Sequence, residues 1–362
     1  MKQIIRLIIT VALAFTVSNI SLLSQFGGGN GTAASPYQIH NKTHFNLLTD
    51  STNNSNPNMP NWSNGKYFKL MNNIIDTVRT IINNFGGHFD GNGFKIVLGI
   101  DVPNSGAGLF GMLSNTVIST ISNVITEGYV KGSGKVGSIV GYAMGNSSVS
   151  VITIKNCINN CNVTGISFAQ CVGGIAGYTV NCNIENCINN GKISARIYAG
   201  GIIGQATAGK IVNCTNTGEI SSNRVGGITG CYIGTMENCV NTGEISGDSL
   251  VGGLNGHLHI GSKIIDCINI GTVRGNILVG GISTSADEDA GIEISNCENN
   301  GLVIGNDKVG GILGYLRQGR ISNCVNSGVV EGKTTKTGCI VGEKAGGTVT
   351  NCHYDMQMCK EE

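Results

Sequence analysis

Short apolar segments alternate with turn residues along most of the chain. In one stretch typical of the rest, apolar segments occupy 225–228, 236–240 and 244–245, with polar residues and glycines between them. β-Branched residues within such segments recur with a period of 2, which is the periodicity of a strand. Gly or Asn interrupts the segments every five to eight residues, which is too often for stable helices. The pattern predicts many short β-strands joined by tight turns.

A glycine box with the pattern V-G-G-I-x-G recurs eight times. Its second glycine is replaced by Ser138 in one copy and by Cys339 in another. We therefore expect the second position to require only a small side chain, and the first to require glycine's backbone freedom or close packing. The Ile or Leu two residues after the first glycine is expected to stack inward. The first glycines are Gly137, Gly173, Gly200, Gly226, Gly252, Gly280, Gly310 and Gly338.

A cysteine box with the pattern I-x-N-C-x-N-x-G-x-I alternates with the glycine box. Its cysteines are 25 to 30 residues apart, so the repeat is roughly 27 residues long. Asn precedes the cysteine in seven copies and Asp266 replaces it in the eighth. We expect these Asn side chains to stack as an amide ladder at a turn, each bonding to its neighbour's backbone. The cysteines are Cys157, Cys187, Cys214, Cys239, Cys267, Cys297, Cys324 and Cys352.

Three short strands per repeat cannot bury a core alone, so each repeat must stack on its neighbours. Such a stack is a solenoid in which each repeat makes one coil. Each coil advances about 4.8 Å, the spacing between paired strands. The roughly eleven coils between Tyr67 and Tyr354 would form a rod on the order of 50 Å long.

The two boxes closely resemble those of the GLUG-repeat proteins, a family of exported bacterial proteins named for a Gly-Leu-hydrophobic-Gly core. Segments at 35–39, 67–70, 89–94 and 108–111 look like the lead-in that precedes GLUG repeats. The resemblance implies a pectate-lyase-like β-helix in secreted or cell-surface proteins, including regions attached to immunoglobulin-degrading peptidases and adhesins. No catalytic protease segment is visible, so only the scaffold carries over. Thr284 and Asp266 depart locally from the pattern.

The predicted fold is all-β, a right-handed parallel β-helix with about 27 residues per coil. Residues 1–25 are predicted to be a signal peptide, because Lys2 and Arg6 precede a short apolar run. Residues 26–66 are expected to form a lead-in and cap, 67–355 the β-helix, and 356–362 a C-terminal tail. No later apolar stretch approaches 18 residues, so no membrane span is expected after signal removal. The predicted location is secreted or cell-surface.

Composition changes the expected class of partner. Charged residues make up 12% of the chain, and the formal net charge is +1. There is no basic stripe to neutralise phosphates, so nucleic acid is not an expected partner. The 56 glycines and 4 prolines fit a repeat array better than an ordinary enzyme or a disordered chain.

The fourteen cysteines first suggest disulfides, because the protein is predicted to be exported. In-register parallel strands, however, hold the Cβ atoms of stacked cysteines too far apart for a bridge. We therefore expect the eight box cysteines to form a ladder of small buried thiols. Among the other six, Cys182 is a candidate to pair with Cys161 or Cys171, and the sequence does not determine the connectivity. Those six are Cys161, Cys171, Cys182, Cys231, Cys339 and Cys359.

Two patterns raise the question of a metal. Cys157 and Cys161 have the spacing of half a zinc site, but no second matched pair accompanies them. His257 and His259 would lie on one face of a strand, at repeat positions where another copy has Cys231 and Tyr232. Surface histidines are the favoured interpretation, so neither a metal nor another cofactor is predicted.

No catalytic residues are predicted. A glycan-cleaving β-helix needs carboxylates on neighbouring coils, since acid and base must flank one bond. Glu219 and Glu244 share a repeat position, but Lys192 and Thr272 occupy it in other copies, which indicates a solvated face.

A few acidic residues lie outside the boxes. Asp287, Glu288 and Asp289 are weak candidates for binding calcium or a basic ligand, and a solvent loop is the favoured interpretation. Asp76 and Asp90 are expected to serve turns.

The leading functional hypothesis is an exported, non-catalytic surface or secreted scaffold that binds a macromolecular ligand in the manner of an adhesin. The expected partner is a glycan or a host extracellular protein. A polysaccharide lyase or glycoside hydrolase on the same β-helix is the first alternative, and a passive structural spacer is the second.

Overall fold

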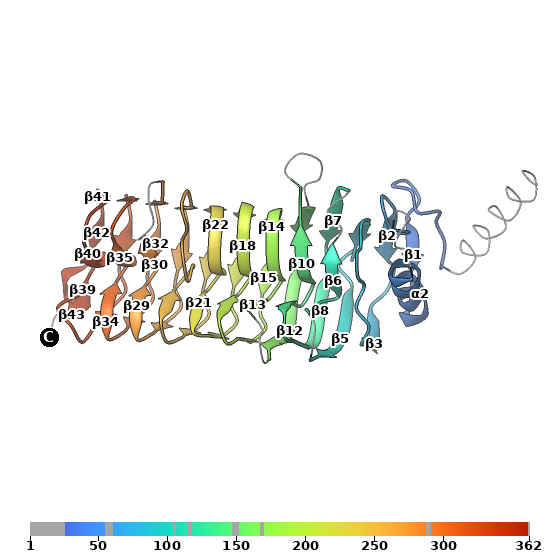
Figure 1. Ribbon diagram of the computed structural model, residues 1–362, viewed down its shortest axis with the longest axis horizontal. Helices are drawn as coiled ribbons and strands as arrows, with labels where there is room; N and C mark the ends of the chain where they lie inside the picture. Colours follow the sequence, from blue (N-terminus) through green and yellow to red (C-terminus); the bar gives the residue numbers. More distant parts are fainter. Residues whose placement is uncertain are drawn as a thin grey trace, which may run out of the picture.

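The structure is a computed structural model, and it is a right-handed parallel β-helix. It has about 11 turns of about 28 residues each, stacked into a rod (Figure 1). The predicted fold class is confirmed. The predicted signal peptide, residues 1–25, lies outside the described residues. The structure describes residues 26–54, 61–103, 106–113, 117–146, 152–166, 170–286 and 291–360.

The coils contribute strands to three parallel sheets. The first sheet has two rows of strands, and its longer row starts near the N-terminus. The longer row is β1 (Tyr37–Ile39), β2 (Tyr67–Leu70), β4 (His88–Asp90), β7 (Ser119–Ser122), β11 (Ile152–Lys155), β14 (Ala176–Glu185), β18 (Ile203–Val212), β22 (Thr229–Glu237), β26 (Lys263–Ile265), β31 (Glu293–Ser295), β36 (Arg320–Ser322) and β41 (Thr348–Thr350). The shorter row includes β6 (Phe110–Leu113), β10 (Val140–Met144), β30 (Ser283–Ala286), β35 (Leu313–Leu316) and β40 (Val341–Lys344).

The second sheet begins with long strands and continues with two short strands per coil. Its strands are β3 (Ile74–Val78), β5 (Lys95–Val102), β8 (Ile125–Gly132), β12 (Ile158–Gly165), β15 (Ile188–Asn189), β16 (Ile193–Ser194), β19 (Thr215–Asn216), β20 (Ile220–Ser221), β23 (Val240–Asn241), β24 (Ile245–Ser246), β27 (Ile268–Asn269), β28 (Val273–Arg274), β32 (Glu298–Asn299), β33 (Val303–Ile304), β37 (Val325–Asn326), β38 (Val330–Glu331), β42 (His353–Tyr354) and β43 (Cys359–Lys360).

The third sheet contains the start of each glycine box. It runs β9 (Lys135–Gly137), β13 (Cys171–Gly173), β17 (Tyr198–Gly200), β21 (Arg224–Gly226), β25 (Leu250–Gly252), β29 (Ile277–Gly280), β34 (Asp307–Gly310) and β39 (Thr337–Gly338). Equivalent repeat positions pair with one another, as Gly200 does with Gly226.

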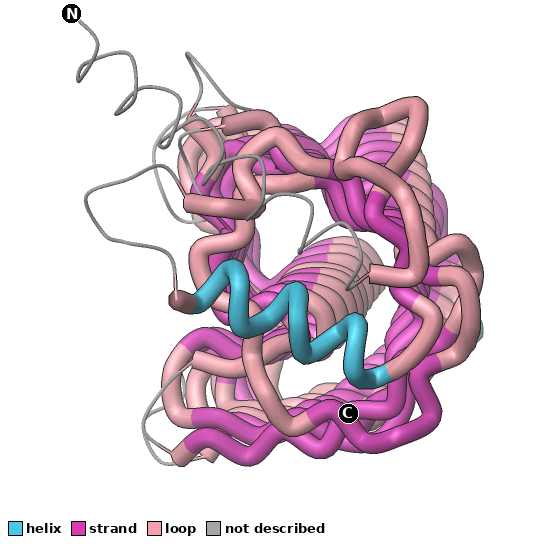
Figure 2. The backbone as a smooth tube through the Cα atoms, turned by 90° about the vertical axis from the view of Figure 1, so that its right-hand side faces the viewer, coloured by secondary structure: helices cyan, strands magenta, loops and turns pink. Residues whose placement is uncertain are grey.

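The two ends of the rod differ in structure. Helix α2 (Lys42–Asn53) lies across the first coil, where Phe45 and Leu48 are fully buried (Figure 2). The Asn41 side chain caps this helix by accepting from the backbone N–H of His44 at 3.0 Å. At the other end, a 3-10 turn (Met356–Met358) leads into β43, which pairs with β38. The last coil therefore extends into residues that the sequence analysis assigned to a tail. In the described part of the chain, no helix is long and apolar enough to cross a membrane.

The aliphatic residue of each glycine box points into the core, as predicted. Seven of the eight are fully buried, and the last is 8% exposed because its coil is near the end of the rod. They form one continuous stack along the axis. The stack consists of Ile139, Ile175, Ile202, Ile228, Leu254, Ile282, Ile312 and Ile340.

The cysteine-box thiols form the predicted buried ladder. Each of the first seven thiols is buried and free, while Cys352 at the end is half-buried. Each Sγ lies 3.1–3.4 Å from the carbonyl oxygen two residues earlier in its own coil. Each buried Sγ also contacts a carbonyl oxygen of the preceding coil at 3.5–3.9 Å. A small polarisable thiol therefore fits between two backbones.

The residues before these cysteines form an exposed amide ladder. Asn186 Nδ2, for example, donates to Asn156 Oδ1 at 3.1 Å. All of them adopt the left-handed backbone conformation with φ of 51–55°, which explains why only Asn and Asp266 occur here. The predicted ladder is confirmed, but the predicted bonding to neighbouring backbone is wrong. Each described link joins two side chains.

A second, fully buried Asn ladder runs inside the coil. In six of the seven, the Nδ2 donates to the Oδ1 of the next coil at 2.6–2.8 Å. Each Nδ2 also donates to the carbonyl two residues further on at 2.9–3.0 Å. The sequence analysis assigned these residues no role. They are Asn159, Asn189, Asn216, Asn241, Asn269, Asn299 and Asn326.

Both glycines of the box are required by close backbone packing. A Cβ on Gly226 would lie 2.2 Å from the carbonyl oxygen of Thr229. A Cβ on Gly227 would lie 2.2 Å from the carbonyl oxygen of Gly253 and 2.4 Å from Cγ of Asn241. The expectation that the second position needs only a small side chain is therefore wrong wherever a buried Asn lies against it.

The exceptions at the second glycine lie at the two ends of the buried ladder. Ser138 is in register with Gly174, to whose carbonyl its hydroxyl donates at 2.6 Å, and the hydroxyl of Thr126 in the preceding coil donates to Ser138 at 3.1 Å. Cys339 lies in the last coil, where Tyr354 pairs with Asn326 and ends the ladder. Both exceptions therefore lie where the Asn ladder ends.

Replacing Gly226 by Val should destabilise the fold by about 3 kcal/mol or more, because the added Cβ clashes with backbone atoms of its own and the next coil. Thermal unfolding measures this effect. Thr215→Val is the matched control, since Ile188 and Val240 already occupy its row in the adjacent coils. Equal melting temperatures for the two variants would contradict the packing described here.

Replacing Asn241 by Asp should cost about 3 kcal/mol at pH 7, because a buried carboxylate would face Asn269 Oδ1 and the Gly243 carbonyl without donors. Asn238→Asp is the control, since this exposed position is already Asp266 in the next coil. Chemical denaturation compares the two variants. A smaller loss for Asn241→Asp than for Asn238→Asp would refute the role of the buried ladder.

Candidate functional site

A surface pocket lies on the outer face of the first sheet near the N-terminal end. It has a volume of about 480 Å³. Strands β2, β4, β7 and β11 contribute its lining, together with the lead-in segment that precedes β1. The lead-in is tied to β2 by a bond from the backbone N–H of Tyr67 to the carbonyl of Gly31 at 2.9 Å. The lining residues are Ala33, Pro36, Tyr67, Phe68, Lys69, His88, Phe89, Asp90, Thr120, Ser122, Asn123, Lys155 and Asn156.

Strand alternation determines which side chains reach this pocket. Phe68 and Phe89 are buried in the core, so their neighbours on β2 and β4 point outward. Tyr67 pairs with His88 across these strands, and their rings stack with centroids 4.3 Å apart and planes 18° apart. Burial lowers the pKa of His88 below its usual value, so the imidazole is neutral at pH 7. The pocket therefore contains a flat, uncharged aromatic surface.

Hydrogen-bonding groups lie next to the aromatic pair. Asp90 Oδ1 accepts from Asn123 Nδ2 and from the backbone N–H of Asn92, both at 2.8 Å. Lys69 Nζ lies 3.7 Å from Asp90 Oδ2. The bond to Asn92 closes the turn after β4, which confirms the predicted turn role of Asp90. These groups offer both donors and acceptors to a ligand.

Asp90 is the one carboxylate among the residues that line this pocket. Hydrolysis of a glycosidic bond ordinarily needs two carboxyl groups roughly 5–9.5 Å apart. The pocket residues thus provide the groups of a binding site, but one of the two carboxyl groups that hydrolysis ordinarily needs. The positions of Glu219 and Glu244 agree with the predicted solvated face, because each forms an ion pair with a cation on an adjacent coil, at 2.9 Å to Lys192 and 3.0 Å to Arg274.

The weak binding candidates Asp287, Glu288 and Asp289 lie outside the described residues. The pocket could not be predicted from the repeat, because most of its lining residues come from early segments that lack both repeat boxes.

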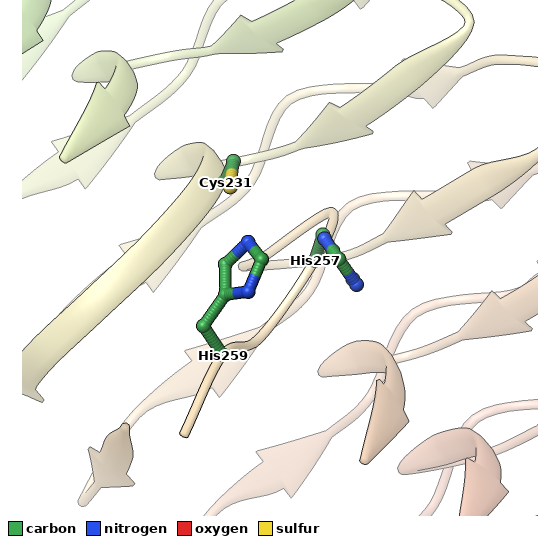
Figure 3. A group of neighbouring side chains, drawn as sticks. All are labelled: Cys231, His257 and His259. Atoms are coloured by element: carbon green, nitrogen blue, oxygen red, sulfur yellow. The ribbon is translucent and has the colours of Figure 1, made fainter. Parts of the chain in front are cut away.

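The two histidines singled out from the sequence meet a cysteine. Atoms of Cys231, His257 and His259 that can bind a metal lie within 4.8 Å of one another (Figure 3). Cys231 is 2% exposed, and the two imidazoles are half-buried. The favoured interpretation of surface histidines therefore needs correction, since both are half-buried and lie in a cluster with a buried thiol.

The other cysteines outside the ladder do not pair as suggested. Cys161, Cys171 and Cys182 are free and buried, so the suggested pairings are wrong. Burial raises the pKa of Cys161 and of Cys182 to about 12, which keeps both thiols protonated. Cys339 is disulfide-bonded.

The comparisons with known proteins agree with the repeat. Residues 168–194 and 195–221 match the family model of the GLUG motif. The chain therefore carries GLUG repeats on a right-handed parallel β-helix, as the resemblance of its boxes indicated. A solved structure from Bacteroides ovatus, described provisionally as an immunoglobulin A1 protease, is 25% identical with a TM-score of 0.42. That match covers 60% of this chain and 78% of the other. Among proteins with curated descriptions, none matches this chain.

Lowering the pH from 8 to 5 should destabilise the protein in part through His88. Because the pKa of His88 is lowered on folding, the unfolded state takes up its proton first as the pH falls through about 6.5. The stability that depends on a neutral His88 is therefore present above pH 6.5 and lost below it. In His88→Gln this loss should be absent, so the fall in melting temperature with pH should be shallower than in the wild type. Identical slopes would contradict the assignment.

Proposed function

We propose that this chain is an exported, non-catalytic scaffold that binds a glycan at the Tyr67–His88 pocket. The observation that carries the proposal is the stacked aromatic pair beside Asp90, Lys69 and Asn123. An aromatic plane packs against the C–H face of a sugar ring, while neighbouring polar groups bond to its hydroxyls. The pocket offers both features within one concave surface.

The scaffold supports such a site because it is rigid. The outward side chains sit on paired strands whose inner faces are buried, for example through Phe68 and Phe89. Binding groups held on strands lose little freedom when a ligand binds. A glycan would therefore meet a preorganised surface.

A second outward aromatic pair on the same sheet favours a polymeric glycan. Tyr142 and Tyr178 stack with centroids 5.4 Å apart on β10 and β14. Lys135 Nζ lies 4.9 Å from the Tyr142 ring centroid. A second aromatic contact on the same sheet would add to the affinity for a long ligand.

The charges favour a neutral glycan. Lys69 is paired with Asp90, and Lys155 is in register with Glu185 on the adjacent strand. The pocket therefore lacks the cluster of unpaired cations that would recognise a polyanion. A secreted or surface location remains part of the proposal and is supported by the pattern of residues 1–25.

Binding to an array of neutral oligosaccharides tests the proposal, followed by calorimetry on the best ligand. Tyr67→Ala should weaken that binding about 10-fold, because it removes the aromatic platform. Tyr354→Ala is the control, since Tyr354 is 48% exposed and does not line the pocket.

The alternatives give different outcomes in the same experiments. Release of new sugar ends, abolished by Asp90→Asn, would favour a lyase or hydrolase. Binding to host extracellular proteins alone would replace the glycan with a protein ligand. No binding to either class would favour a passive spacer.

A further inference from the structure

Three metal-ligand side chains meet outside the glycan pocket, where two coils depart from regular pairing. Cys231 comes from β22, and His257 and His259 come from the next coil (Figure 3). The two imidazole rings have centroids 4.4 Å apart and are inclined at 65°. The three donor atoms lie within 4.8 Å of one another.

The backbone holds these residues in place. Tyr232 and Leu258 are fully buried and bridge the two coils, so the residues beside them point away from the core. The N–H of Tyr232 donates to the His257 carbonyl at 3.0 Å, and the N–H of His259 donates to the Tyr232 carbonyl at 3.1 Å. The same face of the sheet therefore presents the thiol and both imidazoles.

Among the described residues that align with these three positions in neighbouring coils, this combination of a thiol and two imidazoles occurs only here. Tyr142, Tyr178 and Gln205 precede Cys231 in register on successive strands. Extending the bridges Tyr232–Leu258 and Asn255–Ser283 along the chain aligns His259 with Ile233 and His257 with Ser285. A purely structural requirement of the coil would not select a thiol and two imidazoles at one place.

We propose that Cys231, His257 and His259 bind a borderline-soft divalent cation of the zinc class. A thiolate and two imidazoles suit Zn²⁺, whereas Ca²⁺ and Mg²⁺ prefer oxygen ligands. Donors at about 2.0–2.3 Å from Zn²⁺ lie about 3.5 Å apart in a tetrahedron. Metal binding would therefore require rotations of these side chains that shorten separations of up to 4.8 Å. The fourth position is available to water or a ligand.

Binding would release one proton, because the Cys231 thiol must become a thiolate that donates its electron pair to the metal. No bond to carbon changes and no electron is transferred to the cation. The metal would link two coils at a point where the first sheet has only isolated bridges between them. This site is separate from the pocket proposed to bind glycans.

The test is a titration of the tag-free, reduced, chelator-treated full chain with Zn²⁺ in a calorimeter. We expect one Zn²⁺ per chain. Cys231→Ser and His259→Asn should each weaken binding by roughly 100-fold, because each removes one of three protein ligands. Co²⁺ in place of Zn²⁺ should give the visible bands of a tetrahedral site and a near-ultraviolet thiolate band that Cys231→Ser abolishes.

Two matched controls separate the site from general effects. Cys171→Ser removes another buried thiol, and His353→Asn removes an exposed histidine. Both should bind Zn²⁺ as the wild type does. His259→Asn changes a half-buried side chain, so it tests the site even where Cys231→Ser fails to fold, with circular dichroism confirming the fold.

Three results would overturn the proposal. They are the absence of Zn²⁺ binding by the wild type, equal binding by His259→Asn and the controls, and equally tight binding of Ca²⁺. Glycan binding should be unchanged in His259→Asn, so failure of this proposal and failure of the proposed function remain distinguishable.

Discussion

The buried asparagine ladder is the interaction on which the rest of the coil depends. Each amide in it donates twice and accepts from the preceding coil, so the buried polar atoms are satisfied. One such bond contributes only about 0.5–1.5 kcal/mol net, whereas an unmatched buried amide costs about 1–3 kcal/mol. A coil that slips by one residue would leave both its own amide and its neighbour's unmatched. The ladder therefore determines the register of the stack as well as contributing to its stability.

This constraint links the two sequence boxes. The buried amide lies directly against the second glycine of the glycine box, as Asn241 lies against Gly227. The amide occupies the space that a Cβ would need, so the two positions must be understood together. Ser138 takes the glycine position at the end of the ladder, where the preceding coil has Thr126, whose hydroxyl donates to Ser138. The left-handed turn and the thiol that precede each buried Asn place it at the same height in every coil.

The periodic features could be predicted from the sequence, and the features that break the period could not. The inward aliphatic stack and the thiol ladder follow from residues that recur every 25 to 36 positions. The buried Asn ladder was missed, because Asn with a Gly two residues later is typical of an exposed turn. The pocket was missed because Tyr67 and His88 are only 21 residues apart and belong to early coils without the boxes. The histidines were noticed, but the closeness of Cys231 depends on the register of a coil with little regular pairing.

The same constraint explains where function can reside on this rod. A residue in a regular coil must match equivalent residues above and below, so its identity is dominated by packing. Outward positions in irregular coils do not have to match the residues of the adjacent coils. The Tyr67–His88 pocket lies beside the lead-in, and the Cys231 cluster lies where only isolated bridges join two coils. Residues that break a local rule commonly do so at functional sites, because the cost in packing must be offset by a gain elsewhere. Both proposed sites therefore lie where the ladder allows the sequence to differ, on a scaffold that the ladder keeps rigid.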